Sequence, residues 1–127
     1  MILDSSAILA IVEEPEADFV RARIRASREA HLPVIALVEA ALVIAGRLGK
    51  DPSAYLAELI TELSVKPLNF DHAQSLVAID AFLEFGKGRH REGLNFGDCM
   101  IYAAANVLKE PLLFTGDDFA HTDIISA

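Results

Sequence analysis

The sequence predicts an α/β fold in which helices cover both faces of a parallel sheet. Short apolar segments recur along the chain, at Met1–Leu3, His31–Ala36 and Pro111–Thr115. Longer helical patterns separate them, and strands that alternate with helices form parallel βαβ units. The 127 residues, of which 53% are hydrophobic, are enough for one domain with a packed core. We therefore expect a single domain over residues 1–127.

The elements follow from local signals in chain order. After the first strand, the turn Asp4-Ser5-Ser6 offers either serine as the cap of a helix, which Pro15 ends. Gly49 closes the helix after the second strand, and Pro67 marks an edge strand. We expect helices over residues 7–12, 16–30, 37–48, 51–63 and 71–85, and a sixth that begins near residue 98.

Two further expectations concern the core and the end of the chain. Asp71 caps the fifth helix. Residues 121–125 add a last edge strand. The expected core of the second and fifth helices consists of Phe19, Val20, Ile24, Ala73, Leu76, Val77, Ile79, Ala81 and Phe82.

Composition limits the possible surroundings and partners of the chain. The longest nearly apolar run, Leu32–Gly46, is too short for a membrane span, and Asp4 interrupts any signal peptide. The single cysteine, Cys99, fits a reducing compartment, and we expect a cytoplasmic protein without membrane contact. The net charge of −8 argues against a general nucleic-acid binder. Acids gathered in one pocket can nevertheless hold divalent cations, which reverse the local sign of the charge.

Asp98 lies in the first turn of a helix that is apolar on almost every side. Asn95 precedes it by three residues, so the two can form a capping arrangement in which the helix dipole favours the negative charge. Such a carboxylate also lies where the core meets any open cavity. The stretch alone supports a cap and a functional site equally.

Glu39 is the only charged residue between Leu32 and Gly46. Acids are rarely buried without a partner, because burying a lone ionised carboxylate costs several kcal/mol. An ion pair with a distant arginine is one explanation. Because no basic residue lies within one helical turn of Glu39, a functional role is the better one.

Four acids follow the predicted strands or start a helix beside them: Asp4, Glu39, Asp98 and Asp117. The carboxyl ends of parallel strands share one rim, where ligands bind in open α/β sheets. Carboxylates that meet there repel one another unless a cation lies between them. Oxygen ligands, without clustered histidine or cysteine, indicate Mg²⁺, with Mn²⁺ as a substitute.

Nucleotide-cradling loops and a thiol nucleophile are absent from the sequence. An aspartyl-phosphate enzyme would carry an aspartate two residues after Asp4, where this chain has Ser6. A phospho-accepting receiver domain would need a lysine after the last strand, and none follows Lys109. Metal-assisted hydrolysis of a phosphodiester remains.

Two basic segments allow two readings each. Arg21, Arg25 and Arg28 share one helix face, which is either a solvated surface or a stripe of phosphate contacts. The loop 86–91 contains Lys87, Arg89 and Arg91 beside glycines. It is either a solvated connection or a source of phosphate contacts next to Asp98.

Four segments together resemble the PIN-domain ribonucleases, and within them the VapC toxins of bacterial type II toxin–antitoxin pairs. They are Asp4-Ser5-Ser6-Ala7, Glu39 in the helix after the second strand, the segment 94–99, and the segment 113–119. The resemblance implies a three-layer α/β/α fold with a central parallel sheet of four to five short strands. It also implies magnesium-dependent endoribonuclease activity.

By position, Asp4, Glu39, Asp98 and Asp117 match the acidic quartet of the family, and Ser6 matches its small hydroxyl residue near the metal. Asp118 is a second candidate for the role of Asp117. The resemblance further implies a homodimer and a cognate antitoxin whose tail, often carrying an arginine, covers the acidic pocket.

We therefore expect an endoribonuclease in which Asp4, Asp98 and Asp117 hold the metal and Glu39 binds it or orients the attacking water. Ser6, Asn95, Arg89 and Arg91 are the expected contacts to RNA. The alternative is a metal- or protein-binding module of the same fold without catalytic activity.

Overall fold

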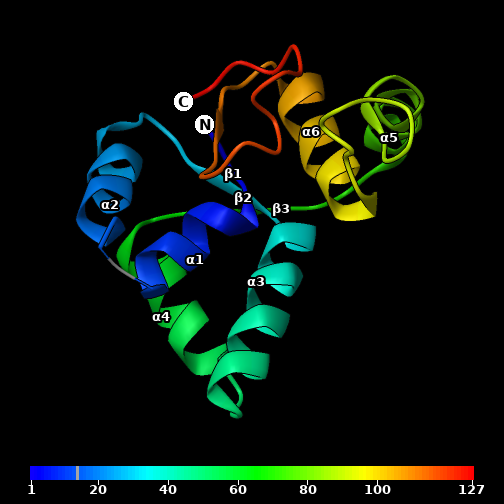
Figure 1. Cartoon of the computed structure of the whole chain (residues 1–127). Helices are drawn as coiled ribbons and strands as arrows, with labels where there is room; N and C mark the ends of the chain where they lie inside the picture. The colour runs from blue at the N-terminus through cyan, green and yellow to red at the C-terminus, as the bar shows by residue number, and fades with distance from the viewer. Residues whose placement is uncertain (14) are drawn as a thin grey trace.

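Four short parallel strands form the centre of the protein (Figure 1). The computed structural model describes residues 1–13 and 15–127. The strands pair in the order β3-β2-β1-β4, and Ile2 lies opposite His31 on one side and Leu112 on the other. The predicted α/β class is confirmed, with strands β1 (Ile2–Leu3), β2 (His31–Pro33), β3 (Lys66–Leu68) and β4 (Leu112–Leu113).

Helices connect all consecutive strands. β2 is added beside β1 and β3 beside β2, toward the same edge of the sheet, whereas β4 lies on the opposite side of β1. Because such crossovers are right-handed, the helices of the last connection cover the other face of the sheet, as Figure 1 shows for α5 and α6. The described helices are α1 (Ser5–Glu13), α2 (Ala17–Ala26), α3 (Val34–Leu48), α4 (Ser53–Glu62), α5 (His72–Phe85) and α6 (Phe96–Leu108).

The strand order reverses between β1 and β4, because β2 and β3 lie on one side of β1 and β4 lies on the other. In open α/β sheets ligands bind at the carboxyl ends of the strands at such a position. Asp4 directly follows β1, and Gly116–Phe119 follows β4 after two residues. None of the helices in the described part of the chain is long and apolar enough to span a bilayer.

Two helix starts were predicted too late in the sequence. α1 begins at Ser5, so both serines lie inside the helix, and the Asp4 carboxylate accepts a hydrogen bond from the Ser6 N–H at 3.1 Å. Aspartate competes well with serine for this capping position. β2 ends at Pro33 and α3 starts at the next residue, although the apolar run continues to Ala36. The predicted stop at 13–15 includes Glu14, which lies outside the described residues.

The predicted core of α2 and α5 was partly wrong. Val20, Ile24 and Ala81 are buried, but 65% of Phe19 is exposed. α5 buries a stripe of Gln74, Ala78, Ala81 and Phe85. Apolar residues surround most of α5, so the pattern could not identify the buried face. Of the other core candidates in α5, Val77 is half-buried and Ala73, Leu76, Ile79 and Phe82 are exposed.

One edge of the sheet agrees with the sequence, and the other differs from it. β3 is the outer strand on one side, as its proline indicates. On the other side the chain end pairs with β4: the Leu112 N–H donates to the Ile125 carbonyl, and the Ala127 N–H donates to Leu112, both at 2.8 Å. The strand predicted over residues 121–125 was wrong: these residues form turns and irregular backbone, and the chain pairs with β4 only through an isolated bridge at Ser126.

Candidate active site

Asp4 lies at the carboxyl end of β1 and is 6% exposed. Its Oδ2 accepts hydrogen bonds from the Ser6 hydroxyl at 2.5 Å and from the Ser6 N–H at 3.1 Å. Burial raises the pKa of the Asp4 carboxyl above its ordinary value, although the bonds from Ser6 act in the opposite direction. The sheet and the start of α1 thus hold this carboxylate in a fixed position.

Ser6 connects β4 to Asp4. The Thr115 N–H donates to the Ser6 hydroxyl oxygen at 3.0 Å, and this hydroxyl donates to Asp4. The segment after the last strand is therefore linked to the acid after the first strand. Ser6 orients Asp4, a role consistent with its position in the family motif, and the Thr115 contact could not be read from spacing.

Glu39 lies in the second turn of α3, beside the start of α6. Its carboxyl group packs against Gly97, where a Cβ atom would lie 2.8 Å from the Glu39 carboxyl carbon and from both its oxygens. Burial, together with the negative charges of Asp4 and Asp98, raises the pKa of Glu39 to about 7. Its Oε1 is buried without a hydrogen-bond partner among the described residues.

Asp98 forms a capping box with Asn95, as the sequence indicated. The Asp98 N–H donates to Asn95 Oδ1 at 2.9 Å, and the Asn95 N–H donates to Asp98 Oδ2 at 3.1 Å. The pKa of Asp98 is raised to about 6, mainly by burial and further by the charges of Asp118 and Asp4, while the bond from Asn95 acts in the opposite direction. Asp98 is thus both a helix cap and part of an acidic cluster.

The turn after β4 brings Asp118 to this cluster. The negative charge of Asp118 raises the pKa of both Asp4 and Asp98. Asp117 and Asp118 are both exposed, but the electrostatic contacts connect only Asp118 to the cluster within the described residues. We define the acidic cluster as Asp4, Glu39, Asp98 and Asp118.

The acidic cluster suits a divalent cation chemically, because its members repel one another and one buried oxygen of Glu39 has no partner in the described part of the chain. Over residues 1–13 and 15–127, no three acidic, histidine or cysteine side chains converge on one point as metal ligands. Mg²⁺ commonly keeps several waters and takes only one or two carboxylates directly. The oxygen-only donor set fits that mode of binding.

The arginines that the sequence offered as phosphate contacts lie in two places, on α2 and in the loop after α5. Arg21 and Arg25 both pair with Glu62, at 2.6 and 3.1 Å, which favours the reading of a solvated helix face. In the loop after α5, the Arg89 guanidinium lies over the Phe82 ring, 5.6 Å from its centroid, and Arg91 is exposed.

Gly97 is the site residue that sequence reasoning missed. It separates Phe96 from Asp98, and its lack of a side chain lets the Glu39 carboxyl approach the helix start. A glycine inside a helix costs about 1 kcal/mol relative to alanine, so its presence needs a packing reason. That cost was the one available signal in the sequence.

Comparison with known proteins agrees with this architecture. Residues 1–125 match the family described as the PIN domain. Ribonuclease VapC30 of Mycobacterium tuberculosis is 40% identical over 126 residues, which cover 98% of this chain and 95% of that protein. Ribonuclease VapC of Mycolicibacterium smegmatis is 37% identical over 125 residues, with coverages of 98% and 97%.

Solved structures share the fold at low sequence identity. The crystal structure of VapC20 from Mycobacterium tuberculosis, a toxin that cleaves the sarcin–ricin loop, aligns with a TM-score of 0.76, 14% identity, and coverage of 99% of this chain and 97% of that one. A toxin–antitoxin complex from Klebsiella pneumoniae gives 0.72 at 16% identity, covering 99% and 95%. With the family match over nearly all its length, this chain belongs to the PIN-domain family, among its VapC ribonucleases.

Proposed function

We propose that this protein is a Mg²⁺-dependent endoribonuclease that acts in the cytoplasm as the toxin of a toxin–antitoxin pair. The observation that carries the proposal is the acidic cluster. In it the charges of Asp4 and Asp98 raise the pKa of Glu39, the charge of Asp4 raises that of Asp98, and a buried Glu39 oxygen has no partner among the described residues. The names of the relatives supply the substrate class, because they are ribonucleases.

Asp4 and Asp98 are the proposed principal metal ligands. When bound, Mg²⁺ or Mn²⁺ supplies an activated water and neutralises charge on the phosphate. Ser6 holds the Asp4 carboxylate in place, and the capping box holds Asp98. Glu39 binds the metal or orients the attacking water, and its pKa of about 7 suits it to accept a proton from that water. The acid after β4, Asp117 or Asp118, completes the site.

The proposed RNA contacts are Ser6, Asn95, Arg89 and Arg91. Asn95 is exposed beside Asp98, and Ser6 is half-buried beside Asp4, so both flank the acids. Arg89 and Arg91 belong to the basic loop 86–91. A guanidinium group can form bidentate hydrogen bonds with a phosphate. These arginines place positive charge on a chain whose net charge is −8.

An antitoxin arginine fits a cavity beside the site. This cavity of about 290 Å³ is lined by Ser6 and Thr115 at the site and by Glu13 and Glu16 at its acidic rim. A guanidinium group placed there would lie beside the Glu16 carboxylate and next to Ser6, whose hydroxyl donates to Asp4, while Glu13 itself pairs with Arg47. We propose that the tail of the cognate antitoxin occupies this cavity.

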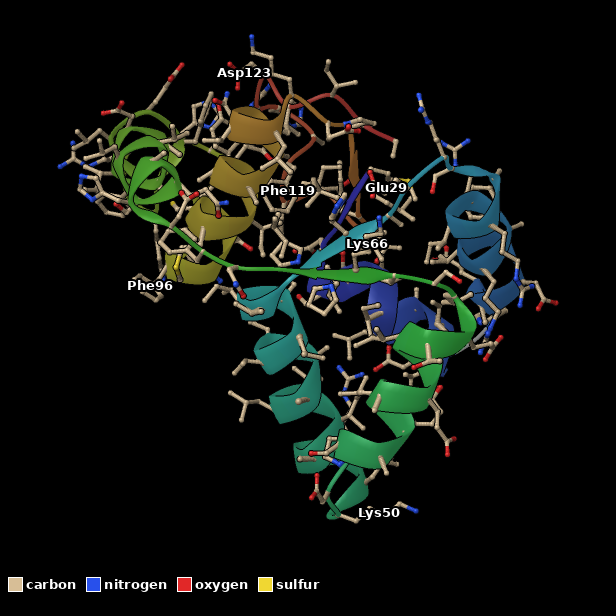
Figure 2. The ribbon with its side chains drawn as sticks, turned by 180° about the vertical axis from the view of Figure 1, so that it is seen from behind. Glu29, Lys50, Lys66, Phe96, Phe119 and Asp123 are labelled. Atoms are coloured by element: carbon tan, nitrogen blue, oxygen red, sulfur yellow. The ribbon has the colours of Figure 1, made fainter. Side chains whose placement is uncertain are left out.

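A homodimer is the proposed assembly, and an apolar face supports it. α5 carries a second apolar stripe beside its buried one, continuous with exposed residues of α3 and with Phe96, which Figure 2 shows pointing away from the body of the protein. Large apolar patches on soluble proteins mark interfaces, and a two-fold dimer buries the same patch of both copies. This dimer face consists of Val38, Leu42, Leu76, Ile79, Phe82, Leu83 and Phe96.

The deciding experiment measures cleavage of mixed RNA with Mg²⁺ or with chelator, for the natural protein and for Asp98→Asn. We expect cleavage only with Mg²⁺ and a loss of about 100-fold or more in the variant, the scale of a single lost electrostatic contact at a reacting centre. Asp80→Asn, an exposed acid on α5, is the matched control and should cleave normally. A natural protein that cleaves no RNA would instead indicate the binding module without catalytic activity.

A further inference from the structure

Glu92 is a buried acid outside the acidic cluster, in the loop between α5 and α6. Its side chain is only 5% exposed. Oε1 contacts Nδ1 of His121, and Oε2 has no partner among the described residues. A buried carboxylate needs a partner, because leaving it alone costs several kcal/mol. The contact with His121 is therefore the main compensation that this side chain has.

The loop that carries Glu92 is firmly built. The Leu94 N–H donates to the Phe85 carbonyl and the Lys87 N–H to the Leu94 carbonyl, both at 3.0 Å. The His90 ring packs edge-on against Phe85, with centroids 5.2 Å apart, and its Nδ1 accepts the Glu92 N–H at 3.1 Å. Glu92 is thus presented from a fixed support.

His121 ends the acidic turn, which we define as residues 116–121. Inside this turn the Ala120 N–H donates to the Asp117 carbonyl at 3.1 Å. Phe119 anchors the turn in the core, where it is 1% exposed and packs against Phe114 with ring centroids 5.3 Å apart (Figure 2). Phe119 fixes one point of the acidic turn. The orientation of the turn about that point depends on a second contact, which His121 makes with Glu92.

We propose that Glu92 and His121 are positioning residues that hold the acidic turn where Asp118 lies near Asp4 and Asp98. Asp118 is exposed on the turn, and none of the described hydrogen bonds holds its carboxylate. The contact between Glu92 and His121 connects the turn to the loop that contains Arg89 and Arg91. The inference extends the proposed function, because it concerns the geometry of the same site.

The experiment compares Glu92→Gln, His121→Gln and the double variant with two controls, His72→Gln and Glu58→Gln, which change exposed residues of α5 and α4. The first measurement is hydrogen exchange at the Ala120 and Thr122 amides, which donate to Asp117 and Phe119 within the turn region. This measurement needs neither metal nor RNA. The second is the Mg²⁺ concentration that gives half-maximal cleavage, with kcat and KM measured separately.

We expect both single variants to exchange these two amides at least tenfold faster and to need several-fold more Mg²⁺, with little change in KM. The double variant should match the singles, because either substitution removes the same pairing of a carboxylate with an imidazole. The hydrogen bond from the Tyr102 hydroxyl to Asp123, at 2.5 Å, keeps the following segment docked in all of them.

Unchanged amide exchange would overturn the proposal, as would a lower melting temperature with an unchanged Mg²⁺ requirement, which indicates stability alone. If Glu92→Gln does not fold, His121→Gln decides, since its side chain is 47% exposed. If the natural protein cleaves no RNA, the proposed function fails, and exchange at Ala120 and Thr122 still decides whether the turn is held by this pair.

Discussion

The Glu39 carboxyl group lies directly over the backbone of Gly97, so that a methyl group at position 97 would be 2.8 Å from its carboxyl carbon. Two helices from opposite faces of the sheet, α3 and α6, meet at this contact. It places Glu39 beside Asp98, one residue further along α6. The acidic cluster therefore depends on a residue that has no functional group.

Replacing Gly97 with alanine should reduce RNA cleavage by about 10- to 100-fold, because a displacement of about 1 Å at a reacting group costs that much. The folded protein should persist, since alanine favours a helix over glycine by about 1 kcal/mol. Cleavage kinetics and thermal melting of the variant measure the two effects separately.

Gly46 provides the matched control for that substitution. It lies in α3, and a Cβ atom there would meet nothing within 4 Å. Gly46→Ala should raise stability by up to about 1 kcal/mol and leave cleavage unchanged. Equal cleavage by Gly97→Ala and Gly46→Ala would contradict the role given to the contact with Glu39.

The pH dependence of stability should reveal the raised pKa values of about 7 for Glu39 and about 6 for Asp98. The folded protein holds these protons more tightly than the unfolded chain, whose values are near 4.5 and 3.8. Their contribution to the free energy of unfolding is fully present below about pH 4 and is lost as the pH rises through 6 and 7.

Glu39→Gln isolates this effect, because glutamine imitates the protonated acid at every pH. In metal-free buffer the variant should gain stability relative to the natural protein as the pH rises from 5 to 8, measured by chemical denaturation. A difference that stays constant over this range would show that Glu39 titrates in the same way in the folded and unfolded chain.

Millimolar Mg²⁺ should raise the melting temperature at pH 8, where the acidic cluster is most highly charged. A ligand that binds only the folded state adds about 1.4 kcal/mol at ten times its Kd. NaCl of equal ionic strength controls for screening, and Asp98→Asn should lose most of the shift. A melting curve that responds equally to the two salts would argue against a specific cation site.

Asp117→Asn and Asp118→Asn distinguish the two acids of the last turn. Because the charge of Asp118 raises the pKa of Asp4 and Asp98, removing it should lower both values and weaken cleavage more than the change at Asp117 does. Carboxylate titration by NMR and cleavage rates test this order. The reverse order would restore the role that the family motif assigns to Asp117.

Ile79→Glu should convert the proposed dimer into a monomer, because Ile79 is 58% exposed on the dimer face and a charge cannot be buried there without a partner. Leu48→Glu changes a residue of similar exposure, 57%, outside this face and should leave the dimer intact. Sedimentation of the three proteins gives the answer, and a natural protein that is already monomeric at about 100 µM would refute the dimer.

Much of the fold followed from the sequence, because its strands and helices differ in length and because capping residues, glycines and prolines mark their ends. Asp71 and the pair Asn95 and Asp98 carry cap signals that the structure reproduces. The buried face of α5 did not follow, since Ile79 and Phe82 are as apolar as the side chains that face α6. The neighbouring helix and any partner chain decide which apolar stripe is buried. The periodicity of one helix gives no information about either of them.

The sequence brought Asp4, Glu39 and Asp98 together as one group, but it did not indicate the residues that support them. Asp4, Glu39 and Asp98 stand out as charges next to apolar segments, so strand-end reasoning could group them. Gly97 lacks a side chain, and the bond from Thr115 to Ser6 joins residues 109 positions apart. Whether Asp117 or Asp118 lies near the other acids depends on how the turn after β4 is oriented. Two adjacent aspartates give no sequence signal that distinguishes between them.

In the capping box only one of the two carboxylate oxygens of Asp98 accepts a hydrogen bond. Oδ2 accepts the Asn95 N–H and so takes part in starting α6, while none of the described hydrogen bonds occupies Oδ1. An asparagine can still supply one acceptor to the helix start, but it cannot provide the negative charge. Asp98→Asn should therefore keep an acceptor for the Asn95 N–H while removing the negative charge, so that a loss of activity in a folded variant can be assigned to that charge.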